Sequence, residues 1–214
     1  MPYGTYKALD EIANKFDIEI NRLEFLSETN CIIEDFFIWY IKKSLLDVTN
    51  YVSENSICET MISPILRIVL EKYDLPLWSH VRFDVSPEEG LTGIPDFLVA
   101  PATKTGLSFT NPVVCIAEVK KENFDEGWTQ ALCEMIAAQR FNKSTQKPIY
   151  GIATGGHFWQ FGKLIEKQLV LDLRIYSPTM DLQRLFNALN WFFGEAKKTI
   201  DLPNGSSHSV GEVG

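Results

Sequence analysis

The chain has 214 residues, of which 45% are apolar and 22% are charged, as in an ordinary globular domain with its own core. No apolar stretch is both long enough and sufficiently free of charge to span a bilayer. The net charge of −8 argues against general adhesion to nucleic acid, because duplex-binding domains usually present a basic surface. A local basic patch remains compatible with this acidic total.

The cysteines and the N-terminal sequence both bear on the compartment. None of the cysteines has CxxC spacing, and each lies within an apolar segment, so we expect reduced thiols in the core and no zinc site. The first residues lack the basic and apolar regions of a signal peptide, so we expect a cytoplasmic protein. The cysteines are Cys31, Cys58, Cys115 and Cys133.

The N-terminal part, residues 5–50, is predicted to be a helical extension. Its apolar residues fall near one helical stripe that runs from Leu9 to Ile20. The segment from Cys31 to Ile41 is almost entirely apolar, so we expect it to be well buried.

A second helix is predicted from Glu54 to Tyr73, with Ser53 as its N-cap. Pro64 is expected to kink this helix. Glu54 projects onto the middle of the apolar face, whereas Glu59 projects towards its edge. A carboxylate on a core-facing stripe is costly unless it has a partner, although Glu54 could also simply interact with the helix dipole.

The rest of the chain alternates strand and helix patterns. Strands are predicted at 77–85, from Asp96, at 113–120, at 148–153 and at 168–175, and helices at 125–141 and 181–197. Gly155-Gly156 indicates a hairpin turn. The order predicts an α/β fold with a central mixed sheet flanked by helices, in a single domain over 1–200 whose core is 53–198, followed by a flexible tail at 201–214.

Three polar residues, Asp96, Glu118 and Lys120, lie at the ends of two apolar segments that are otherwise typical of strands. Glu118 and Lys120 lie two residues apart after Val113–Ala117, so the period of a strand sends both side chains to one face. If the strand that begins at Asp96 pairs with this one, two carboxylates and an ammonium converge. Oxygen ligands of this kind suit Mg²⁺ or Mn²⁺, and a neighbouring lysine can orient or deprotonate a water.

Each of these residues also has a plainer explanation. Asp96 follows Pro95 and could be an ordinary turn residue, and Glu118 with Lys120 could be a solvated strand end. His80 and His157 have no partner at catalytic spacing, so we interpret both as structural.

The pattern Pro95-Asp96 with Glu118-Val-Lys120 resembles the PD-(D/E)xK nuclease superfamily, which has the restriction-endonuclease-like fold. The resemblance covers roughly residues 53–165. The stretch from Ser53 to Gly162 is similar to a stand-alone cyanobacterial-type group related to the N-terminal nuclease domains of type I restriction subunits. Further residues that carry the resemblance are Ile62-Ser-Pro-Ile-Leu66, Leu77-Trp-Ser-His80, Gly127-Trp-Thr-Gln130 and Glu134-Met-Ile-Ala-Ala-Gln139.

The resemblance implies roles for particular residues. Asp96 and Glu118 would hold Mg²⁺ or Mn²⁺, Lys120 would act on the attacking water, and Glu54, in preference to Glu59, would complete the metal shell. Gln130 would help to position the site or the nucleic acid, although it could also be an ordinary polar residue of the surface. Glu134, one turn further on, would bind a second metal or, in our preferred interpretation, hydrogen-bond its neighbours.

The implied function is metal-dependent hydrolysis of phosphodiester bonds in nucleic acid, with DNA as the favoured polymer. Either a partner protein supplies a motor and specificity, or the domain works alone, in which case a second copy of the chain could serve to cut both strands. Two alternatives stay open at this point: a non-catalytic nucleic-acid-binding or assembly module on the same fold, and a metal-dependent hydrolase of another phosphate ester.

Overall fold

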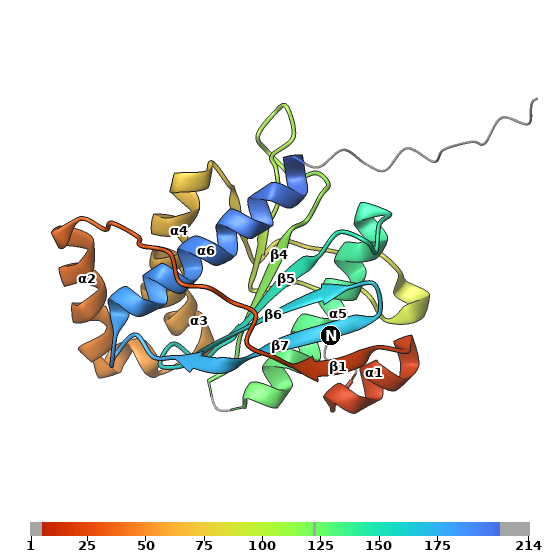
Figure 1. The fold of residues 1–214 in the computed structure, drawn as a ribbon, viewed down its shortest axis with the longest axis horizontal. Coiled ribbons are helices and arrows are strands. Elements are labelled where there is room, and N and C mark those ends of the chain that lie inside the picture. Colours follow the sequence, from red (N-terminus) through yellow and green to blue (C-terminus); the bar gives the residue numbers. More distant parts are fainter. Residues whose placement is uncertain (1–5, 122, 202–214) are drawn as a thin grey trace, which may run out of the picture.

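A seven-stranded mixed sheet forms the centre of the molecule (Figure 1). The computed structural model describes residues 6–121 and 123–201. The strand order is β1-β7-β6-β5-β4-β3-β2; β1 pairs with β7 and β4 with β5 in parallel, and the other pairs are antiparallel. The strands are β1 (Glu19–Arg22), β2 (Leu77–Ser79), β3 (Phe97–Val99), β4 (Cys115–Val119), β5 (Ile149–Thr154), β6 (Trp159–Ile165) and β7 (Gln168–Tyr176).

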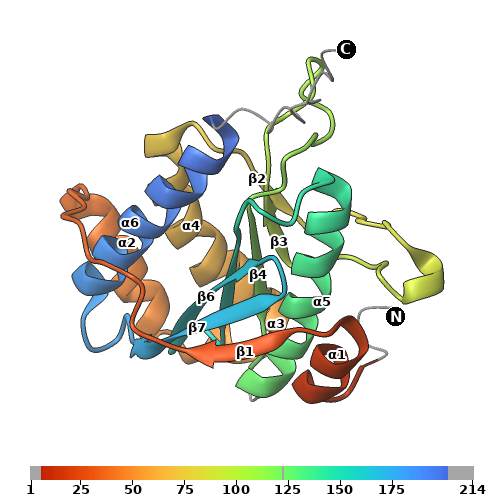
Figure 2. The ribbon, with the colours of Figure 1, turned by 45° about the vertical axis from the view of Figure 1, so that its right-hand side comes forward.

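Helices cover both faces of this sheet (Figure 2). One face carries α1 (Leu9–Phe16) and α5 (Phe124–Asn142), and the other carries α3 (Glu54–Ile57), α4 (Ser63–Leu70) and α6 (Leu182–Asp201), with α2 (Asp35–Leu46) outside them. The predicted α/β class with a mixed sheet flanked by helices is therefore confirmed. No helix in the described part of the chain combines the length and apolar character needed to cross a bilayer.

Alternation along the central strands builds a separate core on each face. Phe97 and Val99 of β3 join the core beneath α4 and α6, whereas Leu98 joins the core beneath α5. All four cysteines are buried and unpaired, as predicted. The side of β4 that carries Ile116 also carries Glu118, so this carboxylate is directed into the layer beneath α5.

The N-terminal extension is not entirely helical, contrary to the prediction. Ile20 belongs to β1, which extends the sheet by pairing Glu19–Arg22 with Gln168–Leu171 of β7. The chain that follows is fixed by the buried carboxylate of Asp172, which accepts hydrogen bonds from the backbone N–H groups of Phe25 at 3.0 Å and Leu26 at 2.8 Å. The prediction was wrong because an apolar residue of this short edge strand, Ile20, happens to continue the helical spacing of the apolar residues before it.

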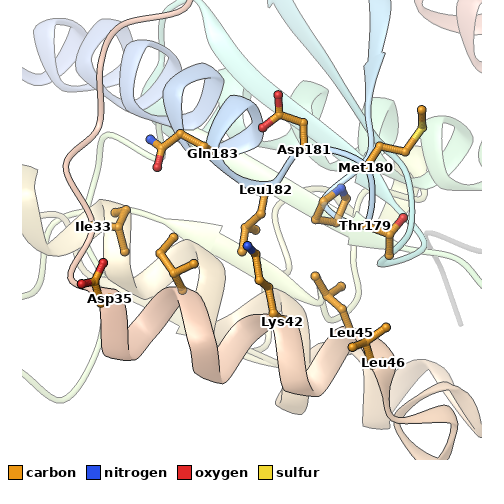
Figure 3. A pocket seen from close by; sticks show the side chains of 12 residues that line it. Ile33, Asp35, Lys42, Leu45, Leu46, Thr179, Met180, Asp181, Leu182 and Gln183 are labelled. Carbon is orange, nitrogen blue, oxygen red and sulfur yellow. The ribbon is translucent and has the colours of Figure 1, made fainter.

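The expected burial of the segment from Cys31 to Ile41 is also wrong. Helix α2 begins only at Asp35, and within it Phe36 and Trp39 are 63% and 56% exposed. The helix lies at the outside of its layer, so only one of its faces contacts the rest of the protein. A pocket of about 560 Å³ lies between α2 and the start of α6 (Figure 3).

The predicted helix from Glu54 to Tyr73 is present, but it contains a wider turn. Ser53 accepts a hydrogen bond from the backbone N–H of Ser56 at 3.1 Å, which confirms it as the N-cap. A π-helical turn spans Cys58–Ile62, and α4 then starts at Ser63 with Pro64 in its first turn. Proline has no N–H to donate to the preceding turn, so the wider turn accommodates it within a continuous helix.

The strand predicted at 77–85 is shorter than expected, because β2 ends at Ser79. His80 adopts a left-handed conformation with φ of 51°, which turns the chain out of the strand. The hairpin at Gly155-Gly156, the helix over 125–141 and the strand over 168–175 are confirmed with small changes in their bounds. In the predicted tail 201–214, Asp201 ends α6, and residues 202–214 lie outside the described residues.

Candidate functional site

Asp96 and Glu118 lie side by side at one end of the central strands. Phe97 of β3 pairs with Ala117 of β4, which places the residue before Phe97 beside the residue after Ala117. The backbone N–H of Asp96 lies 3.3 Å from Oε1 of Glu118, and the backbone N–H of Val119 donates to Oδ2 of Asp96 at 2.8 Å. The pairing of the two strands thus brings both carboxylates together, as the motif predicted.

Lys120 and Glu54 approach the same point. The ammonium Nζ of Lys120 lies 3.5 Å from Oε2 of Glu54, and the backbone N–H of Lys121 lies 3.4 Å from Oε1 of the same carboxylate. Lys120 is 16% exposed and Glu54 is 44% exposed, so the site opens to solvent on the side of α3. Glu59, the alternative helix carboxylate, is exposed on the π-helical turn.

The turn between β5 and β6 closes against this end of β4. A side chain at Gly155 would place its Cβ 2.8 Å from the backbone oxygen of Lys120, a distance that real Cβ atoms essentially never show. Only glycine therefore allows the hairpin to approach the strand that carries Glu118 and Lys120.

Glu118 and Glu134 form a buried acid pair. Burial, and then the nearby charge of Asp96, raise the pKa of Glu118 to about 8. Burial and the charge of Glu118 raise the pKa of Glu134 well above its usual range. No N–H or O–H group of the described residues donates to either Glu134 carboxylate oxygen. A hydrogen bond between the two acids therefore forms only when one of them carries a proton.

The pKa values of Asp96 and Lys120 are also shifted by their surroundings. Burial raises the pKa of Asp96, although the Val119 N–H and the charge of Lys120 partly oppose this increase. Burial acts to lower the pKa of Lys120, but Glu118, Glu54 and Asp96 outweigh it and raise the pKa. Lys120 is thus an ammonium at neutral pH, which suits it to orient a water or to stabilise negative charge rather than to accept a proton.

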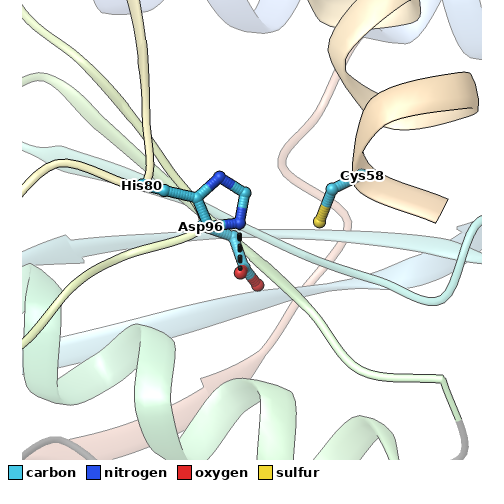
Figure 4. Close-up of side chains that lie close together, drawn as sticks. All are labelled: Cys58, His80 and Asp96. Atoms are coloured by element: carbon cyan, nitrogen blue, oxygen red, sulfur yellow. Dashed lines mark ion pairs between the residues drawn. The ribbon is translucent and has the colours of Figure 1, made fainter. Parts of the chain in front are cut away.

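Cys58 and His80 join this cluster, although the sequence analysis assigned neither to the site (Figure 4). Nε2 of His80 lies 3.5 Å from Oδ1 of Asp96, and Cys58 lies one turn after Glu54 along the helix. Burial, followed by the charges of Asp96, Glu118 and Glu54, raises the pKa of the Cys58 thiol. The spacing of four residues between Glu54 and Cys58 is the one sequence signal that points to this cysteine.

The last of the predicted site residues, Gln130, has no hydrogen bond to the cluster. Gln130 is half-buried on α5, and its side chain makes no hydrogen bond with another described residue. His157 stacks on Tyr51 with ring centroids 4.1 Å apart, which agrees with a structural role. None of the predicted site residues lines the pocket beside α2.

The carboxylates at this strand end are of the chemical type that binds a divalent cation. Asp96 and Glu118 lie side by side and are largely removed from water, and Glu54 lies at the same strand end, 3.5 Å from Lys120, although the ligand atoms of the three carboxylates are not all within 4.8 Å of one another. Carboxylate oxygens in this number are the ligands that Mg²⁺ and Mn²⁺ prefer. A cation here would also offset the charge of Asp96, which together with the larger effect of burial raises the pKa of Glu118.

Comparison with protein-family models, with curated proteins and with solved structures found no match to this chain.

Proposed function

We propose that this protein is a nuclease of the restriction-endonuclease-like fold that hydrolyses phosphodiester bonds with Mg²⁺ or Mn²⁺, and that DNA is its substrate. The observation that supports this most directly is the pairing of β3 with β4, which sets Asp96 beside Glu118 and leaves Lys120 at the same strand end. The sequence resemblance supplies the reaction class, and the local geometry agrees with it.

In this proposal Asp96, Glu118 and Glu54 hold the metal ion. The ion, when bound, supplies Lewis acidity to a phosphate oxygen and lowers the pKa of a coordinated water. Lys120, held as an ammonium by the surrounding carboxylates, orients the attacking water and stabilises the negative charge that develops on the phosphate oxygens. Glu54 is exposed enough to adjust its position when the substrate arrives.

The charge of the protein limits how DNA is bound. The net charge of −8 gives little general attraction to a polyanion, so affinity has to come from the metal ion and a few basic side chains near the site, such as Lys121. We therefore expect cleavage to be favoured by low ionic strength.

The test is cleavage of supercoiled plasmid and of single-stranded DNA with Mg²⁺, with Mn²⁺ and with chelator. Asp96→Asn and Lys120→Met should each reduce cleavage by about 10²-fold or more, as loss of an electrostatic contact in a transition state does. Glu59→Gln and Lys104→Met are the matched controls, because both side chains are exposed outside the cluster. Cleavage that survives both site substitutions would refute the assignment.

One observation favours the alternative of a non-catalytic assembly module. Phe36 and Trp39 of α2 expose apolar surface of the kind that often marks a protein contact. This alternative predicts a folded protein that cleaves neither DNA form under any metal condition.

A further inference from the structure

Three different metal-binding side chains meet beside the carboxylate pair. One ligand atom from each of Cys58, His80 and Asp96 lies within 4.8 Å of the other two. They come from three separate elements: the π-helical turn after α3, the residue after β2 and the residue before β3 (Figure 4). These elements are far apart in the sequence, so tertiary packing alone brings a sulfur, an imidazole and a carboxylate together.

The imidazole is already oriented for such a role. The backbone N–H of His80 donates to the backbone oxygen of Asp96 at 3.0 Å, which fixes the two residues next to each other. Nδ1 of His80 lies 2.8 Å from Oγ of Ser79, so Nε2 is the ring nitrogen that faces Asp96. Metal-binding histidines commonly have their second ring nitrogen engaged in this way, because the contact fixes the ring orientation.

The donor set differs from the one proposed for Mg²⁺. Thiolate and imidazole are ligands of Zn²⁺ and related transition metals, whereas Mg²⁺ prefers oxygen. Three protein ligands leave the fourth position of a tetrahedral ion open to water, as in catalytic rather than structural zinc sites. His80 and Asp96 are 39% and 19% exposed, so an ion and its water can reach the cluster from solvent.

We propose that Cys58, His80 and Asp96 bind a transition-metal ion of the Zn²⁺ class, with one coordination position open to solvent. The metal–sulfur bond forms as the Cys58 thiol releases its proton to water, so one proton leaves for each ion that binds. Asp96 is shared with the proposed Mg²⁺ ligands, and Glu54 adds negative charge nearby that favours any cation. The metal supplied would then decide which donor set is used.

The experiment is a titration of the full-length, chelator-treated protein with Co²⁺, which replaces Zn²⁺ and has visible absorption. We expect about one Co²⁺ per chain, a thiolate-to-cobalt charge-transfer band in the near ultraviolet, and displacement of the Co²⁺ by Zn²⁺. Cys58→Ser should remove the charge-transfer band. His80→Asn should weaken Co²⁺ binding about 10-fold or more, and asparagine tolerates the left-handed backbone conformation at this position.

Cys133→Ser is the matched control, because Cys133 is another buried thiol but lies on α5 outside the cluster. It should retain both the band and the affinity. A wild-type protein without a charge-transfer band would overturn the proposal, as would a band that persists in Cys58→Ser. The exposed position of His80 keeps the test decisive even if Cys58→Ser fails to fold.

This inference stands apart from the proposed nuclease, although the two share Asp96. Glu118→Gln should remove Mg²⁺-dependent cleavage and keep the Co²⁺ charge-transfer band, since Glu118 is not among the three ligands. A Co²⁺ band in a protein that never cleaves DNA would support the transition-metal site and refute the nuclease. Cleavage with Mg²⁺ in a protein without the band would support the nuclease and refute the transition-metal site.

Discussion

The backbone N–H of Asp96 points at the side chain of Glu118, and the backbone N–H after Glu118 points back at the side chain of Asp96. Each carboxylate is thus held by the strand that carries the other. The position of the two acids is a property of the β3–β4 pairing, and it does not depend on a flexible loop.

The first prediction concerns the cost of burying Glu118. Its pKa rises from the usual 4.5 to about 8, so between these pH values the folded protein binds more protons than the unfolded chain. Stability should therefore fall as the pH rises through this window. Glu118→Gln removes the ionisation and should raise the melting temperature more at pH 8 than at pH 5. A gain of about 1–2 kcal/mol corresponds to roughly 2–8 °C.

Thermal melts at both pH values measure this effect. Glu59→Gln is the control, because it makes the same substitution at an exposed carboxylate outside the buried acid pair. Equal shifts for Glu118→Gln at the two pH values would show that Glu118 does not titrate in this range.

The second prediction concerns metal binding without substrate. An ion that binds only the folded state at about 100-fold excess over its dissociation constant adds roughly 2.7 kcal/mol of stability. We expect Mn²⁺ to raise the melting temperature of the wild-type protein and Asp96→Asn to abolish this shift. Glu54→Gln should reduce the shift, because this partly exposed carboxylate lies at the edge of the cluster. An unchanged shift in Asp96→Asn would place the ion elsewhere.

The third prediction tests the anchor of the N-terminal segment. Asp172 is fully buried, accepts hydrogen bonds from two backbone N–H groups, and pairs with Arg174 at 2.9 Å. Asp172→Ala leaves these donors without a partner and should cost about 3–5 kcal/mol in unfolding free energy. Asp17→Ala is the contrast, since its pair with Lys167 is exposed to solvent and should contribute much less to stability. Urea denaturation compares the two.

The fourth prediction compares the same substitution, glycine to alanine, at two positions. A Cβ at Gly162 would lie 2.6 Å from the ring of Trp128, so Gly162→Ala should destabilise the protein by about 1–3 kcal/mol. A Cβ at Gly127, within α5, meets only ordinary contacts of 3.5 Å and longer. Gly127→Ala should therefore stabilise the protein by about 0.5–1 kcal/mol through helix propensity. Shifts of the same sign in denaturant melts would contradict this account.

The sequence predicted the sheet class and the meeting of Asp96, Glu118 and Lys120 because both depend on strand periodicity close to these residues. It did not predict β1, since the pairing of Glu19 with Gln168 joins positions that no local pattern relates. His80 was assigned no role in the site for the same reason: its approach to Asp96 depends on how β2 and β3 pair and on a turn of the backbone after Ser79.

The mistaken burial of α2 has a different cause. Apolar composition indicates that a segment prefers contact, but it does not identify the surface that supplies the contact. Ile41 and Leu45 are buried against other parts of the chain, whereas Phe36 and Trp39 are exposed to solvent. The role of Glu54 remains a prediction that the Mn²⁺ melting experiment addresses, and the role of Gln130 also remains a prediction.

The π-helical turn at Cys58–Ile62 separates α3 from α4 within one continuous helix. It determines how far the side chains of α3 are rotated about the helix axis relative to those of α4. Each helical residue turns the chain by about 100°, so the extra residue in the wide turn rotates Glu54 relative to the core-packing side chains of α4. Removing one residue from the turn would leave α4 seated in the core and swing Glu54 away from Lys120. The length of this turn therefore determines the direction in which the Glu54 carboxylate points, whereas the packing of α4 in the core stabilises the fold.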